Sequence, residues 1–116
     1  MKPNSCLYRA VKKVVEYQFG ITGLSSDVFD THNNGDGVPT GIIVDVIESA
    51  LSAHGVKVAA VYGKISDPEN FSRNDLIRAP EFVSAPCIGH ESNHVEGILP
   101  GEYFTGDMAI VLEQCK

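Results

Sequence analysis

The sequence lacks the features that mark several classes of protein. Its 116 residues include no apolar run near the roughly 18 residues that a membrane-spanning helix needs. A basic excess is also absent, because 9 Lys and Arg against 15 Asp and Glu give a net charge of −6, which argues against a nucleic-acid-binding surface. No apolar core follows Lys2, so no signal peptide is expected. We therefore expect a cytoplasmic protein, of the cell or of an infected host, that binds neither membrane nor nucleic acid.

Regular cysteine spacing is missing as well. The three cysteines, Cys6, Cys87 and Cys115, are an odd number at irregular intervals. Without a secretion signal, this usage favours free thiols in a reducing compartment over a disulfide framework.

Internal repeats and low-complexity tracts are absent, and no tract separates two domains. Hydrophobic residues make up 43% of the chain and charged residues 21%, as in an ordinary globular protein. We therefore expect residues 1–116 to form a single domain.

Two amphipathic helices are predicted in the first half of the chain. Apolar residues at helical spacing indicate a helix over residues 5–19, with Asn4 or Ser5 as its cap and Gly20 as its stop. A turn-rich loop is expected over residues 21–39. The second helix should begin near Pro39 and end at Gly55.

Strands dominate the second half. Residues 56–62 are typical of a strand, and a short helix is expected over 67–77. Three further strands are expected over 82–88, 94–99 and 108–114, with the last two paired as a hairpin. The predicted fold class is α+β, with two or three helices on one side of an antiparallel sheet of about four strands.

Cys6 is the strongest candidate for a reactive group. It falls in the first turn of the first predicted helix. The partial positive charge at a helix N-terminus favours a thiolate over a thiol, as a nucleophilic enzyme requires.

Among four histidines, His94 is the best candidate for a general base. It opens a predicted strand and can face a helix N-terminus across a cleft. His32 lies in the loop and His54 near a helix end, where solvent-exposed histidines are common, and His90 belongs to the turn before His94.

A base of this kind needs a partner on its second ring nitrogen. The expected hairpin of 94–99 with 108–114 puts Glu113 opposite His94. Cys6, His94 and Glu113 then form a candidate triad, with Asp107 and Gln114 as alternatives for the third member.

The stretch Asn4-Ser5-Cys6-Leu7-Tyr8-Arg9-Ala10-Val11 resembles the nucleophile helix of papain-like cysteine peptidases. The residues after the cysteine are similar to those of ovarian-tumour-type deubiquitinases. The order of the elements resembles the bacteriocin-processing (C39-like) peptidases, including segments like Ala85-Pro86-Cys87-Ile88-Gly89 and His94-Val95-Glu96-Gly97-Ile98-Leu99.

This resemblance implies a papain-like hydrolase that cleaves an amide or isopeptide bond of a peptide or protein without a cofactor or metal. Cys6 would be the nucleophile, His94 the base, and Glu113, in the place of the family's Asp or Asn, the residue that orients it. The glutamine that stabilises the oxyanion in this family has no counterpart among the five residues before Cys6, so Asn4 or the Cys6 N–H would receive the oxyanion. These departures point to a minimal version of viral or phage type.

The alternative function is a phage, viral or host-interaction binding protein built on a catalytically inactive papain-like scaffold, which the missing glutamine and the short chain favour. The sequence also allows two metal hypotheses. Zinc would use Cys87, His90 and His94, with Cys6 or Cys115 as a fourth ligand. Calcium would use the alternating residues Asp30, His32, Asn34 and Asp36, but Gly41 stands where the bidentate Glu is required, so a plain turn is preferred.

Overall fold

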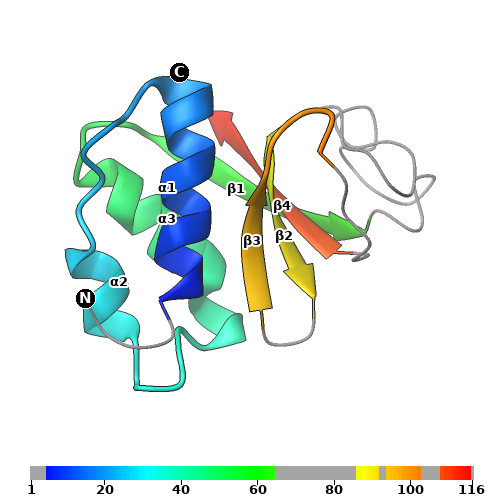
Figure 1. The fold of residues 1–116 in the computed structure, drawn as a ribbon. Coiled ribbons are helices and arrows are strands. Elements are labelled where there is room, and N and C mark those ends of the chain that lie inside the picture. The colour runs from blue at the N-terminus through cyan, green and yellow to red at the C-terminus, as the bar shows by residue number, and fades with distance from the viewer. Residues whose placement is uncertain (1–4, 65–85, 92–93, 103–107, 116) are drawn as a thin grey trace.

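The computed structural model describes residues 5–64, 86–91, 94–102 and 108–115, and in them helices precede strands (Figure 1). The helical elements are α1 (Cys6–Phe19), α2 (Asp27–His32), a 3-10 turn (Thr40–Ile42) and α3 (Ile43–Ser52). The strands are β1 (Val58–Lys64), β2 (Cys87–Glu91), β3 (His94–Ile98) and β4 (Met108–Gln114). The described residues thus form an α+β fold, which confirms the predicted class.

Helix α1 follows the predicted apolar pattern closely. Its buried side chains recur at helical spacing and form one stripe: Leu7, Ala10, Val11, Val14 and Val15. Gly20 ends the helix with a left-handed φ of 71°, a conformation that costs glycine little. Ser5, one of the two predicted caps, is the N-cap residue, but it makes no side-chain capping bond, and its Oγ accepts a hydrogen bond from Arg9 Nη1 at 3.1 Å.

The loop expected over residues 21–39 contains an additional helix, α2. Phe29 on this helix is buried and meets the Tyr8 ring of α1 edge-on, at 5.5 Å between ring centroids. The Tyr8 hydroxyl donates a hydrogen bond to the Leu24 carbonyl at 2.8 Å. The residues around α2 are mostly polar, so little in the sequence indicated that Phe29 is buried. The contact between Phe29 and Tyr8 holds the short helix against α1.

Helix α3 begins three residues later than expected, after the 3-10 turn, and buries one apolar face. His32 and His54 are exposed, as predicted. His54 has a structural contact as well, because its Nε2 accepts a hydrogen bond from the Ser25 N–H at 3.0 Å.

The sheet order corrects the predicted hairpin. The strands are arranged β1-β4-β2-β3, with β4 antiparallel to both β1 and β2, and β2 antiparallel to β3. The expected hairpin of 94–99 with 108–114 is therefore wrong, because β2 lies between those two strands. The predicted helix at 67–77 and the first part of the strand at 82–88 lie outside the described residues.

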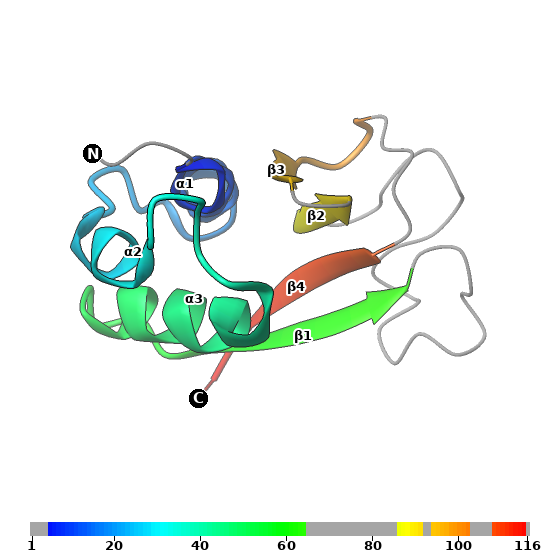
Figure 2. The ribbon, with the colours of Figure 1, turned by 90° about the horizontal axis from the view of Figure 1, so that it is seen from below.

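The helices lie together on one side of the sheet, as the two views show (Figure 1, Figure 2). Alternate strand residues face them and join one core, among them Ile88, Val95, Ile110 and Leu112. Two side chains tie the layers together: Gln18 Nε2 donates to the Leu112 carbonyl at 2.7 Å, and Glu48 Oε2 accepts from the Ala60 N–H at 2.9 Å. No helix within the described ranges is long and apolar enough to cross a membrane.

Candidate active site

Cys6 is the first residue of α1 and lies where the helix meets the β2–β3 hairpin. Its side chain is half-buried, and the thiol is free. Two hollows of the surface meet at this cysteine, one toward α3 and one along β3. The predicted position of Cys6 in the first helical turn is confirmed.

The first hollow has a volume of about 220 Å³ and is called the apolar hollow below. Its carbon lining comes from α1, the loop before α3, α3 itself and β3: Leu7, Val38, Pro39, Ile43 and Val95. Its polar lining is Cys6, Asn34, Asp36, Gly37, Thr40 and His90. Elements far apart in the sequence thus build one cavity beside the thiol.

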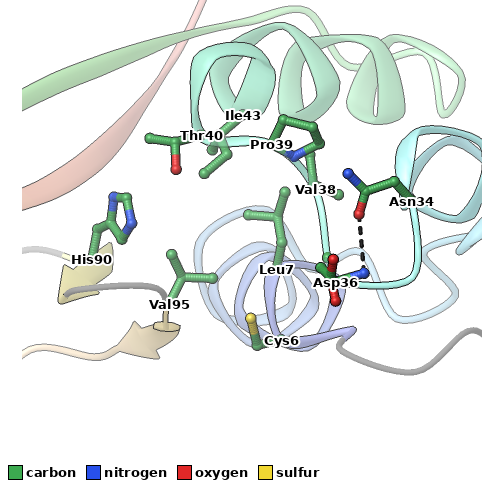
Figure 3. A pocket seen from close by; sticks show the side chains of 11 residues that line it. Cys6, Leu7, Asn34, Asp36, Val38, Pro39, Thr40, Ile43, His90 and Val95 are labelled. Carbon is green, nitrogen blue, oxygen red and sulfur yellow. Dashed lines mark hydrogen bonds between the residues drawn. The ribbon is translucent and has the colours of Figure 1, made fainter.

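Figure 3 shows how the apolar hollow is arranged. Its walls are the loop that bears Asp36 and Val38 on one side and His90 of β2 on the other. In this view Val95 lies between His90 and Cys6. The imidazole of His90 and the thiol of Cys6 therefore border the same hollow from different sides of Val95.

The second hollow, called the edge groove below, runs between α1 and β3. Its residues on α1 follow helical spacing, and those on β3 are consecutive: Cys6, Arg9, Ala10, Lys13, His94, Val95, Glu96 and Gly97. His94 is exposed, and β3 is the outer strand of the sheet on this side. Cys6 and His94, the two catalytic residues predicted from sequence, therefore border one groove.

The alternation of side chains along the hairpin separates the two histidines. His90 pairs with the buried Val95, so both belong to the face toward the helices. His94 pairs with Glu91 and belongs to the opposite face. His90 was considered in the sequence only as a zinc ligand and not as a base, because the strand was expected to end at residue 88 and His90 was assigned to the turn after it.

Glu113 does not lie opposite His94, which corrects the predicted pairing. Its partner is Ala59 on β1, and β4 is separated from β3 by β2. At the level of the histidines β4 contributes Met108, which pairs with His90. Glu113 is five residues farther along β4, roughly 17 Å at about 3.4 Å per residue.

The other predicted site residues have different outcomes. Gln114, an alternative third member, pairs with Val58 and is as remote from His94 as Glu113 is. Asp107, the second alternative, and Asn4, the predicted oxyanion donor, lie outside the described residues.

A short loop between α2 and α3 forms the wall of the apolar hollow. Asn33 is buried, and its Oδ1 accepts hydrogen bonds from the N–H groups of Gly35 at 2.8 Å and Gly37 at 3.3 Å. Both glycines have positive φ values, 102° and 109°, which few other residues adopt. Asn34 Oδ1 adds a bond from the Asp36 N–H at 3.0 Å. Side-chain-capped turns therefore shape this loop.

Replacing Asn33 by alanine is expected to destabilise the protein by about 1–3 kcal/mol, because two backbone donors lose their acceptor. The Asn33→Asp variant puts a carboxylate oxygen in the place of the amide oxygen, so that an acceptor remains, and serves as the matched control. Urea denaturation of both variants measures the difference. An alanine variant as stable as the wild type would show that the turn does not depend on this side chain.

Cys87 is fully buried at the start of β2, and burial raises the pKa of its thiol to about 12. Because the thiolate is the nucleophile, this shift keeps Cys87 in its unreactive thiol form at pH 8. Cys115, by contrast, is exposed. Cys87 therefore has a packing role.

We expect iodoacetamide at pH 8 to label Cys115 in the native protein and to leave Cys87 unmodified until the protein is denatured. Peptide mass spectrometry of native and urea-treated samples reads both sites. Labelling of native Cys87 at the rate of Cys115 would contradict the burial of β2.

The geometry does not support either metal hypothesis. No group of three or more His, Cys, Asp or Glu side chains in the part of the chain with described coordinates is placed to hold a metal ion. In the zinc hypothesis, the register assigns His90 to one face of the hairpin and Cys87 and His94 to the other. In the calcium hypothesis, Asn34 Oδ1 bonds the backbone within a turn.

Lys13, which lines the edge groove, forms an ion pair with Glu102 at the surface. Lys13 Nζ lies 3.0 Å from Glu102 Oε1, which also accepts the Leu99 N–H at 2.7 Å. The Leu99 N–H first, and Lys13 second, lower the pKa of Glu102. The folded carboxyl group thus holds its proton less tightly than the unfolded one, so this contribution to stability is present at neutral pH and is lost as the pH falls through the acidic range.

The comparisons with known proteins give no relative. No protein-family profile matches the chain, and no curated protein or solved structure matches it.

Proposed function

We propose that the protein is a thiol-dependent hydrolase of papain-like type, with Cys6 as nucleophile and His94 as general base and acid. One observation carries the proposal: a half-buried free cysteine in the first turn of α1 borders the same open groove as an exposed histidine at the start of β3. The α+β order of the elements is compatible with it. A nucleophile and a base at a shared, solvent-accessible groove are the minimum for this chemistry.

Two features favour His94 over His90 as the base. His94 is exposed and opens the outer strand, so its imidazole can turn past the sheet edge toward Cys6. His90 lies on the face of the hairpin that is turned toward the helices, but in Figure 3 the Val95 side chain lies between His90 and Cys6. A base must reach hydrogen-bonding distance of the thiol, and His94 borders the open groove that Cys6 also lines.

In the proposed reaction, the Cys6 thiolate attacks the carbonyl carbon of an amide, a C–S bond forms, and the π electrons move to oxygen. The His94 imidazolium gives its proton to the leaving nitrogen as the C–N bond breaks. Neutral His94 then takes a proton from water, whose oxygen attacks the thioester. The C–S bond breaks, which releases the acid and restores the thiolate–imidazolium pair.

Two groups are proposed to stabilise the oxyanion. They are the backbone N–H of Cys6, at the positive end of α1, and the side chain of Asn4. The Ser5 hydroxyl makes no hydrogen bond to the backbone N–H groups of the first turn of α1. It accepts a hydrogen bond from Arg9 instead.

The proposal is tested on a defined library of N-acetylated hexapeptides. New amino termini are counted by mass spectrometry after incubation with the wild type or with Cys6→Ala. We expect cleavage by the wild type and none by the variant. Cleavage that survives in Cys6→Ala would refute the mechanism, and no cleavage by either protein would favour the binding scaffold.

A further inference from the structure

We propose that the apolar hollow binds one aliphatic side chain of the substrate, that of a residue next to the bond attacked by Cys6. This inference rests on the proposed function, since it makes the hollow a specificity pocket of the same site. Cys6 borders both the apolar hollow and the edge groove. A chain held at Cys6 therefore has the hollow immediately beside its reacting carbonyl.

The lining of the hollow selects for apolar groups. Leu7, Ile43 and Val95 are each at most 5% exposed, so the core holds them in place. Val38, half-buried, adds a wall from the loop that Asn33 fixes. Beside the polar lining residues, this carbon surface can bind an aliphatic group by removing its surface from water.

The size of the hollow limits its occupant to one side chain. Its volume of about 220 Å³ falls below the roughly 300–1,000 Å³ of pockets that enclose whole small molecules. A leucine-sized side chain fits within this volume.

Charge at the rim disfavours acidic side chains. Asp36 borders the hollow and is exposed, and the chain as a whole carries a net charge of −6. A substrate carboxylate would be repelled by the negative charge of Asp36. It would also be partly desolvated against the apolar side chains of the hollow, which is unfavourable for a charged group. Leucine should therefore be preferred over both glycine and aspartate.

Binding is tested first in Cys6→Ala, where no chemistry occurs. N-acetyl-leucinamide, N-acetyl-glycinamide and N-acetyl-aspartamide are titrated into protein labelled at its valine, leucine and isoleucine methyl groups. We expect saturable shifts of the Val38, Ile43 and Val95 signals with the leucine compound and at least tenfold weaker binding of the other two. Equal binding of all three, or shifts elsewhere only, would overturn the inference.

Selectivity is tested second in the reactive protein. Peptide chloromethyl ketones with leucine or glycine beside the electrophile are compared for their rate of labelling Cys6, with iodoacetamide as a probe without a side chain. An apolar pocket changes such rates by about 10–200-fold for a missing methylene. We expect at least a tenfold leucine preference in the wild type.

Filling the hollow should remove this preference. Val38→Phe, with Thr40→Phe as a second variant at an exposed rim position, is expected to reduce the leucine preference, measured as the ratio of the two chloromethyl ketone rates, below threefold. Val44→Phe, on α3 outside the hollow, is the matched control. A preference unchanged in both hollow variants would overturn the inference.

The two proposals fail in different ways. If His94-dependent reactivity of Cys6 is found without leucine preference, the hollow is not a specificity pocket. If the methyl shifts appear but Cys6 reacts as an ordinary thiol, the hollow binds an aliphatic group and the hydrolase mechanism fails.

Discussion

Replacing His94 by alanine is expected to lower the rate of peptide cleavage by about 10²- to 10⁴-fold, the usual contribution of a general acid–base group. Without the imidazole, the Cys6 thiol loses the proposed acceptor for its proton, and the leaving amine loses the proposed donor. The loss should appear in kcat, because both proton transfers belong to the chemical steps. Cleavage of one hexapeptide, measured over a series of concentrations, separates kcat from KM.

The control for this experiment is His32→Ala, because His32 is an exposed histidine at the end of α2 that borders neither hollow. Its activity should match the wild type. His90→Ala is measured beside it. A large loss of kcat in His90→Ala with little change in His94→Ala would assign the role of general base to His90 and contradict the assignment to His94.

Replacing Gly97 by alanine is expected to destabilise the protein by about 1–3 kcal/mol, as overpacking in a tight interior does. An added Cβ would lie 2.8 Å from the Ala10 carbonyl oxygen and 3.1 Å from Lys13 Cβ. The first contact is with helix backbone, which cannot rotate away as the end of a side chain can. Helix α1 and strand β3 must therefore separate.

Gly23→Ala is the matched control for Gly97. An added Cβ at Gly23 meets nothing within 4 Å, and its backbone is not in the left-handed region. That variant should be as stable as the wild type or slightly more stable, since alanine restricts the unfolded chain. Urea denaturation compares the two. Equal stabilities would show that α1 and β3 do not depend on this close approach.

The helices were the most predictable part of the fold. The buried residues of α1 and of α3 each recur at helical spacing within one short segment. Each helix could therefore be predicted without knowing which elements it packs against. Helix α2 could not, because its six residues are anchored by Phe29 against Tyr8 of α1, a contact between distant parts of the chain.

Strand pairing was less predictable for the same reason. The strands themselves have local signals, but three short segments near the C-terminus can pair in several orders. The observed hairpin joins Glu91 to His94 across only two residues. A hairpin prediction at that turn would have placed His90 opposite Val95, on the face toward the helices, and would have removed Glu113 from the site.

The candidate site was therefore predicted in part. The prediction of Cys6 depended on where a helix begins, which is a local signal, and its position in the first turn of α1 was correct. The prediction of His94 depended on which strand lies beside α1, which is not a local signal. The structure places His94 at the groove that Cys6 also borders. The third member depended on a cross-strand register, where one wrong pairing moves a residue by many ångströms.

The rate of Cys6 alkylation as a function of pH tests the central claim most directly. Each cysteine is followed by mass spectrometry in the wild type and in His94→Ala. A thiolate–imidazole pair predicts fast labelling of Cys6 near or below neutral pH, and slower labelling at that pH in the variant. If Cys6 instead titrates as an ordinary thiol near pH 8.5 and His94→Ala changes nothing, Cys6 is not an activated nucleophile and the hydrolase account is contradicted.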